Sequence, residues 1–212
     1  MSETTTRRDR KKQQTRQAVG AAAMRLFLDR GFDSVTIADV AREADVAVQT
    51  VFNHFPSKEH LFFQERDSYV SSPSTAIRES GADEPIARAL ARGYLRLLGD
   101  YHVAGLLVHS VDYQRTLDAS PALRTRELEL RQEREDLLAA TLAETAPPLG
   151  EGLRPRLMAA FASAVDRVLD AELRRRLLAG EPAGQVQDSV RPMVAELFDA
   201  AENACRDVRE RM

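Results

Sequence analysis

The chain has 212 residues, of which 43% are hydrophobic and 30% charged, and its net charge is −3. This composition is that of a globular protein and excludes a disordered chain. No apolar run approaches the roughly 20 residues of a transmembrane helix, and the N-terminus lacks the apolar core of a secretory signal. The single cysteine, Cys205, excludes an internal disulfide and a paired-cysteine metal site. We therefore expect a cytoplasmic protein without a membrane partner.

The first segment is strongly basic. Residues 7–17 hold six basic residues and one acidic residue, a local charge of +5. We expect residues 1–14 to form a flexible basic arm and a helix to run from about Thr15 to Arg30, ending at Gly31. A basic arm favours binding to phosphates, although charge runs of this kind are more often merely solvated.

Residues 36–60 have the pattern of two short helices joined by a tight turn. Thr36, followed three residues later by Asp39, predicts a capping box at a helix start. Apolar residues then recur at helical spacing, at Ile37, Val40, Ala41 and Ala44. In the second short helix we expect Val46, Val51 and Phe55 in the core, which leaves Val48, Gln49, Phe52 and Asn53 facing outward. Pro56 ends this helix, and Ser57 can cap the next one.

The rest of the chain also reads as helical. A fourth helix is expected from about Ser57 to Val70. A Ser/Pro/Gly-rich segment over residues 71–85 is expected to form a loop or a broken helix and marks the predicted domain boundary. Further helices are expected at residues 84–101, 104–117, 121–146, 153–179 and 188–211. No segment alternates with the period of a β-strand, so the predicted fold is all-α.

Residues 15–63 resemble the N-terminal DNA-binding domain of the tetracycline-repressor (TetR) family. The resemblance rests on LFLDRGFD, TIADVAREA and TVFNHFPSKEHLF, spaced without gaps. It implies an N-terminal three-helix helix-turn-helix domain over residues 15–63. It also implies a C-terminal helical domain over residues 64–212 for effector binding and dimerisation.

By position, the resemblance implies base contacts from Val48, Gln49, Phe52 and Asn53, and phosphate contacts from Thr36, Thr50, His54 and Lys58. The side-chain amide of Gln49 can hydrogen-bond to adenine, and Val48 can pack against a thymine methyl group. For Phe52 and His54, packing in the core is the competing interpretation. Ala47 stands where the family usually has a capping serine or threonine, and Phe52 replaces a common tyrosine. We expect both changes to weaken DNA binding without abolishing it.

For the C-terminal domain the resemblance implies an unknown small-molecule effector and a homodimer on a palindromic operator. The effector-site candidates are polar or aromatic residues on apolar helices: Tyr94, Tyr101, His102, His109, Tyr113 and Phe161. Each is individually more typical of a core residue. We expect the dimer interface in the apolar stripes of the last two helices, at Phe161, Val165, Val194, Leu197, Phe198 and Ala201. Packing of these stripes within one protomer is the alternative.

No catalytic motif, metal-ligand spacing or cofactor motif is present, so we expect neither an enzyme, nor a metal, nor a cofactor. The sequence thus predicts a ligand-responsive repressor that binds an operator in double-stranded DNA. The alternative is a helical protein of the same fold that acts through protein contacts and has weakened DNA binding.

Overall fold

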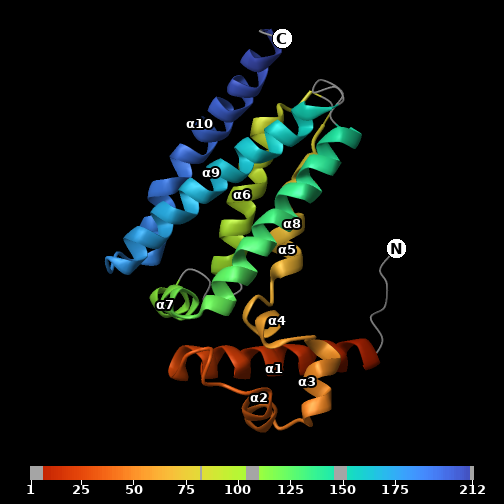
Figure 1. Ribbon diagram of the computed structural model, residues 1–212, viewed down its shortest axis with the longest axis vertical. Helices are drawn as coiled ribbons and strands as arrows, with labels where there is room; N and C mark the ends of the chain where they lie inside the picture. The colour runs from red at the N-terminus through yellow and green to blue at the C-terminus, as the bar shows by residue number, and fades with distance from the viewer. Residues whose placement is uncertain (1–6, 82, 104–109, 146–151, 211–212) are drawn as a thin grey trace. The chain divides into compact units, whose positions relative to one another are not determined.

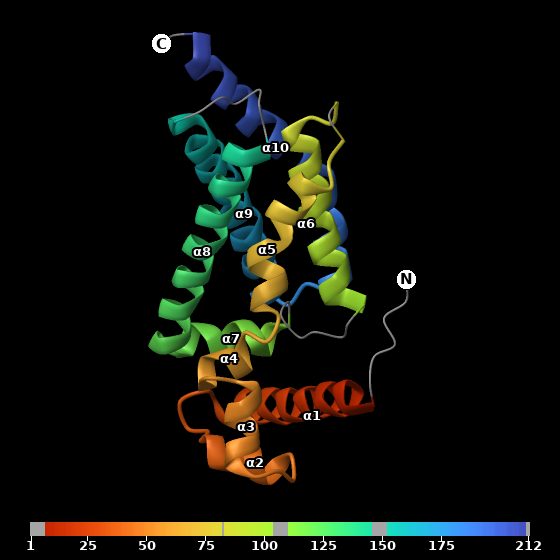
Figure 2. The same cartoon turned by 90° about the vertical axis from the view of Figure 1, so that its right-hand side faces the viewer.

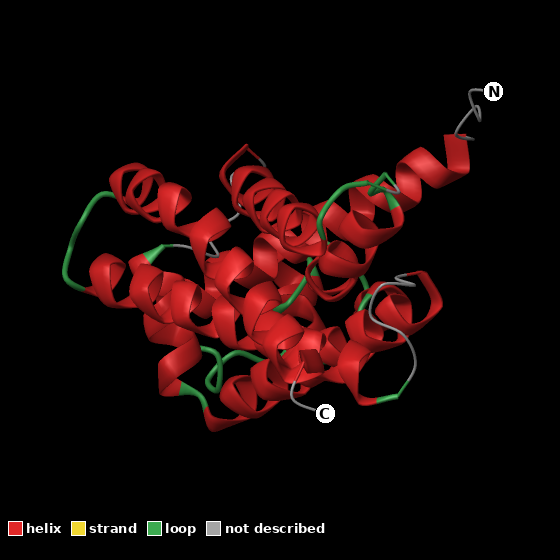
Figure 3. Ribbon diagram, turned by 90° about the horizontal axis from the view of Figure 1, so that it is seen from above, coloured by secondary structure: helices red, strands yellow, loops and turns green. Residues whose placement is uncertain are grey.

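The computed structural model describes residues 7–81, 83–103, 110–145 and 152–210. Every regular element in these ranges is a helix, which confirms the predicted all-α class (Figure 1; Figure 3). In chain order the helices are α1 (Arg7–Arg30), α2 (Ile37–Glu43), α3 (Val48–His54), α4 (Lys58–Phe62), α5 (Arg66–Arg78), α6 (Ile86–Val103), α7 (Val111–Ala119), α8 (Pro121–Thr145), α9 (Leu153–Leu178) and α10 (Ala183–Glu210).

The described chain divides into two compact units. The N-terminal unit contains the residues up to Arg66 together with Arg115–Arg126, and the second unit contains the remainder. The segment 115–126 was predicted within the effector-binding domain, so this part of the predicted division is corrected. One reason is the buried Ser120, whose hydroxyl donates to Oδ1 of Asp33 over 2.8 Å and so joins the start of α8 to the loop after α1.

The first helix is longer than predicted, since α1 begins at Arg7 and not near Thr15. Arginine, lysine and glutamine are good helix formers, and Asp9 in the first turn suits the positive end of the helix dipole. Residues 7–14 are therefore helical, and their positive charges project from a rigid element. The helix ends at Gly31, whose φ of 81° is a left-handed conformation that glycine adopts without strain.

The core of the N-terminal unit is organised around three phenylalanine rings. Phe27 of α1, Phe32 of the following loop and Phe62 of α4 lie with ring centroids 5.0–6.2 Å apart. All three are almost fully buried, and burial of such a side chain contributes about 1.5–3 kcal/mol. This cluster fixes α1, the loop before α2 and α4 to one another. Figure 2 shows α2 and α3 on the same side of α1.

Helix α5 extends into residues 71–85, the segment that was predicted as a loop or a broken helix. It runs through Pro73 to Arg78. Proline lacks an N–H and leaves the carbonyl four residues earlier without its helical partner. That carbonyl belongs to Tyr69, and it accepts a hydrogen bond of 2.7 Å from the buried Arg134. The hydroxyl of the adjacent Ser72 donates to the same carbonyl over 3.3 Å. A long-range contact from α8 and a local hydroxyl therefore compensate together for the proline.

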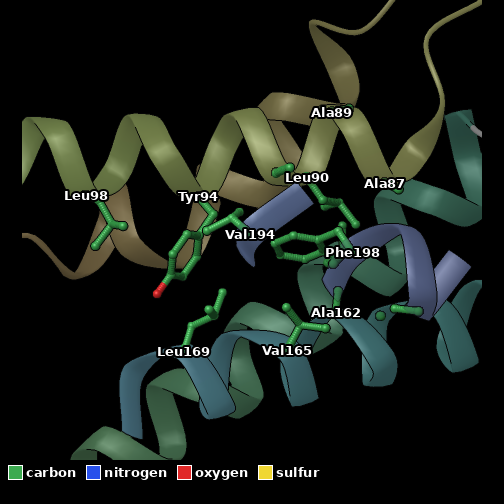
Figure 4. Packing of buried hydrophobic residues seen from close by; sticks show 14 of the residues in the cluster. Ala87, Ala89, Leu90, Tyr94, Leu98, Ala162, Val165, Leu169, Val194 and Phe198 are labelled. Atoms are coloured by element: carbon green, nitrogen blue, oxygen red, sulfur yellow. The ribbon is translucent and has the colours of Figure 1, made fainter. Parts of the chain in front are cut away.

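The core of the second unit lies where α6, α9 and α10 meet (Figure 4). The rings of Tyr94 and Phe198 are 6.3 Å apart between centroids. The other labelled side chains are Ala87, Ala89, Leu90, Leu98, Ala162, Val165, Leu169 and Val194. Helix α10 begins at Ala183, before the predicted start, and passes through Pro192. That proline is exposed, so water can donate a hydrogen bond to the backbone carbonyl four residues earlier, whose helical partner the proline removes.

This packing bears on the residues that were predicted for the dimer interface. Val165, Val194, Phe198 and Ala201 are between 0% and 9% exposed within a single protomer. A side chain that is already buried has almost no surface left to cover with a second copy. Of the six predicted interface residues, only Phe161 and Leu197 keep part of their surface.

Candidate nucleic-acid interface

The start of α2 is built by a capping box. The Thr36 hydroxyl accepts a hydrogen bond from the backbone N–H of Asp39 over 3.1 Å, and the Asp39 carboxylate accepts from the backbone N–H of Thr36 over 3.0 Å. The same hydroxyl donates to Asp39 over 2.6 Å. The hydrogen bonds from Thr36, together with the neighbouring Arg42, lower the pKa of Asp39 to about 2. Thr36 therefore serves the helix start first, with its side chain still exposed.

The turn into α3 relies on two unusual positions. Asp45 has a φ of 51°, the one positive value of a non-glycine residue among the described residues. Aspartate tolerates this conformation better than most residues do. Ala47 occupies the N-cap of α3 in an extended conformation, and no side-chain hydrogen bond caps the helix there. The turn keeps its geometry without the usual hydroxyl cap.

Helix α3 presents two outward ridges. Val48 and Phe52 form an apolar ridge and are 42% and 46% exposed. Gln49 and Asn53 form an amide ridge, and Nε2 of Gln49 donates to Oδ1 of Asn53 over 3.2 Å. All four predicted base-contacting residues are thus exposed side by side on one helix, and Phe52 is not in the core. Thr50 is half-buried near the helix start.

The other face of α3 is fixed to the unit. Val51 and Phe55 are buried, as predicted. Arg16 of α1 donates to the carbonyl of His54 over 2.6 Å, and its guanidinium lies 4.3 Å from the centroid of the Phe55 ring. Arg16 therefore anchors the end of α3, a role that the sequence analysis missed because Arg16 appeared only as one charge in a basic run. The outward ridges are rigid as a result.

His54 is half-buried beside this anchor. Burial lowers the pKa of its imidazole, and the charges of Lys12 and Arg16 lower the pKa further. The ring is therefore mainly neutral at pH 7. A hollow of about 500 Å³ adjoins it between the end of α3 and the start of α1, lined by Asp9, Lys12, Gln13, Arg16, Gln17, Asn53, His54, Gln64 and Glu65.

Lys58 has a different environment from the phosphate contact that the resemblance implied. Its ammonium donates to the carbonyls of Phe32 and Val35 over 2.9 and 3.1 Å. It also lies 4.2 Å from the centroid of the Phe32 ring. In this structure Lys58 ties the start of α4 to the loop that leads into α2.

The structure describes the side chains of three of the six predicted effector-site residues. Tyr94 and Tyr113 are buried, and Phe161 is half-buried against the core of the second unit. The Tyr94 hydroxyl donates to Oδ1 of Asp170 over 3.3 Å. His109 lies outside the described residues, as do the side chains of Tyr101 and His102.

A buried polar cluster that the sequence analysis missed lies between α5, α8 and α9. Arg134 pairs with Oδ2 of Asp166 over 2.7 Å, and its guanidinium lies 4.6 Å from the centroid of the Tyr69 ring. The other carboxylate oxygen of Asp166 is buried without a hydrogen-bond partner among the described residues. Burial raises the pKa of Asp166 to about 6, against the opposing effect of Arg134.

No helix within the described ranges is long and apolar enough to span a membrane.

Comparison with known proteins places this geometry in context. Residues 21–64 match the family described as "Bacterial regulatory proteins, tetR family". Over 205 residues the chain is 29% identical to the HTH-type transcriptional regulator TcmR of Streptomyces glaucescens, covering 90% of this chain and 88% of that protein. It is 24% identical over 164 residues to the fatty acid metabolism regulator protein of Bacillus subtilis, covering 75% of each.

Solved structures share the fold. NalD, the secondary repressor of a multidrug efflux pump in Pseudomonas aeruginosa, aligns with a TM-score of 0.56 at 23% identity, covering 90% of this chain and 97% of that one. FadR of Bacillus subtilis in complex with stearoyl-CoA aligns with a TM-score of 0.54 at 20% identity, covering 86% and 96%.

Proposed function

Because the chain belongs to the tetR family of bacterial regulatory proteins, we propose that this transcriptional regulator is a cytoplasmic, homodimeric repressor that binds a palindromic operator and responds to a small-molecule effector. The exposed, anchored outer face of α3 is the observation that carries the proposal. A short helix with two outward ridges and a buried inner face has the form of a recognition helix for the major groove.

Phosphate contacts in this proposal come mainly from α1. Arg8, Arg10 and Lys12 are exposed on its first turns, and cations held on a rigid helix lose little conformational freedom on binding. Thr50 and His54 supply hydroxyl and ring donors at the ends of α3. Each phosphate neutralised releases a counterion, so log affinity should fall linearly with log salt concentration.

A selection from randomised duplexes tests DNA binding. Wild-type protein should enrich a common palindrome, and a Gln49→Ala, Asn53→Ala double variant should lose the preference at particular base pairs. Leu128→Ala is the matched control, since Leu128 is 66% exposed on α8 and outside the proposed interface. If no common sequence is enriched and a protein partner is retained instead, the alternative of a regulator acting through protein contacts replaces this proposal.

Dimerisation is assigned to stripes that the protomer leaves partly exposed. On α9 these are Phe161, Ala164 and Val168, which follow one another at helical spacing, with Val168 57% exposed. On α10 the corresponding stripe contains Met193, which is 46% exposed, and Leu197. Two recognition helices must address half-sites about one DNA turn apart, and closed two-fold symmetry satisfies this requirement.

A charge on these stripes should separate the protomers without disturbing the protomer core. Val168→Glu and Met193→Glu should each yield monomers in sedimentation at micromolar concentration and weaken operator binding. Leu128→Glu, at a position that is even more exposed and lies on another helix, should remain dimeric. A wild-type monomer would contradict the assignment.

The effector is proposed to bind in the second unit, near the buried cluster around Asp166. A buried carboxylate oxygen without a partner costs free energy that a ligand donor can recover. An effector that binds better to a conformation with separated recognition helices lowers operator affinity by linkage. Ligands found by a thermal-shift screen, with stearoyl-CoA among the probes, should lower operator affinity. If none does so, the proposed ligand response fails.

A further inference from the structure

The apolar ridge of α3 constrains the base sequence that this helix can read. Only a few large hydrophobic side chains of the described residues are more than two-fifths exposed, and Val48 and Phe52 are two of them on one seven-residue helix. Their exposure is not a result of loose packing, since Arg16 and the buried Val51 hold the helix in place. Against a nucleic acid, such a ridge gains nothing from phosphates or from polar base edges. The apolar group that the major groove offers is the 5-methyl group of thymine.

The amide ridge points to the same base pair. The hydrogen bond between Gln49 and Asn53 uses one N–H of Gln49 and the side-chain oxygen of Asn53. Gln49 keeps its oxygen and one N–H, the acceptor and donor that adenine N6 and N7 require. Asn53 keeps both N–H donors, which suit thymine O4 or a purine N7.

Taken together, the two ridges match the complete major-groove edge of an A·T pair. A G·C pair offers no methyl group to the apolar ridge and places an acceptor where Gln49 presents its oxygen. Val48 and Phe52 are four residues apart, a rise of about 6 Å along the helix, so they address different base pairs and not one. We propose that each half-site contains neighbouring A·T pairs whose thymine methyl groups lie against Val48 and Phe52. This inference rests on the proposed DNA binding.

The experiment deletes single methyl groups from the selected operator. Replacing a thymine by deoxyuridine removes the 5-methyl group and leaves base pairing unchanged. Burial of one methyl group corresponds to about a fourfold change in affinity. Wild-type protein should therefore bind about fourfold more weakly when one contacted thymine is replaced, and about sixteenfold more weakly when the equivalent thymine is replaced in both half-sites. Phe52→Ala or Val48→Ala should make the corresponding replacement silent, because the apolar partner is then absent.

Two controls separate this contact from general damage. Phe52→Leu keeps an apolar side chain and should retain sensitivity to deoxyuridine. Gln49→Ala should lose the preference for adenine while also retaining that sensitivity. All of these positions are exposed, so the variants should unfold at wild-type temperatures.

The outcomes distinguish this inference from the function on which it rests. A selected palindrome in which every deoxyuridine replacement is silent, or whose half-sites contain no A·T pair sensitive to Val48 and Phe52, overturns the inference and leaves DNA binding intact. Failure to select any common sequence overturns both. The inference is supported if wild-type protein is sensitive to deoxyuridine at particular positions and if Val48→Ala or Phe52→Ala abolishes that sensitivity.

Discussion

Replacing Lys58 by alanine distinguishes a phosphate contact from an internal brace. The ammonium makes two charge-assisted hydrogen bonds to backbone carbonyls and lies over the Phe32 ring. A hydrogen bond to a charged group contributes about 1.5 kcal/mol at the low end, and the contact with the ring contributes about 0.5–1 kcal/mol. Because solvent can reach part of the vacated site, we expect a net loss of about 3 kcal/mol in the free energy of unfolding. For a chain of this size that loss lowers the melting temperature by roughly 6–12 °C.

The loss in the free energy of unfolding of Lys58→Ala can be measured by urea and thermal unfolding, followed by circular dichroism. All samples are compared at one fixed protomer concentration. Lys12→Ala is the matched control, since Lys12 is exposed on α1. The control should unfold like wild type but reduce the salt slope of DNA binding by about one unit per protomer, about two for the dimer. The reverse pattern, in which Lys58→Ala keeps wild-type stability and lowers the salt slope, would show that Lys58 contacts phosphate and would refute the reasoning.

Three further predictions concern single positions. Ala47→Ser should add a helix cap worth about 1 kcal/mol in urea unfolding, because the backbone there is already extended, and an unchanged midpoint would contradict it. Gly93→Ala should lower the free energy of unfolding by about 1–3 kcal/mol, since its new Cβ would lie 2.7 Å from that of Ala76. Adding Ala76→Gly should restore stability. If it does not, the strain lies elsewhere. Operator affinity of the dimer should rise as the pH falls from 8 to 5.5, by at most tenfold per pH unit for each protomer, because a phosphate would raise the lowered pKa of each His54 and binding would take up one proton per protomer. Anisotropy titrations of His54→Gln should lose this dependence, and its persistence would assign the proton to another group.

The elements that the sequence predicted well are those with local signals. Thr36 and Asp39 are three residues apart, so their mutual hydrogen bonds follow from the spacing alone. The exposed positions of α3 follow from the helical period once Val51 and Phe55 are assigned to the core. The prediction for residues 71–85 kept a loop and a broken helix as alternatives, because one of the deciding contacts comes from far along the chain. Pro73 stays inside a helix because Arg134, distant in sequence, and the adjacent Ser72 hydroxyl both donate to the free Tyr69 carbonyl.

The assignment of apolar stripes to a dimer interface meets a different difficulty. Helix α10 carries one apolar stripe through Val194 and Phe198 and a second through Met193 and Leu197. Both have helical spacing, so periodicity does not tell which stripe meets α6 and α9 and which remains on the surface. Only the packing around Tyr94 assigns Phe198 to the interior.

The N-terminal unit, to which DNA binding is assigned in the proposal, is not a continuous stretch of chain. A chimera that exchanges only the residues up to Arg66 would leave behind Arg115–Arg126, which belong to the same unit. It would pair a foreign residue at position 33 with the native Ser120 and lose the hydrogen bond that Asp33 accepts. Transplanting the operator preference of this regulator into a relative therefore requires two grafts, or a donor whose residue at position 33 also accepts that hydrogen bond.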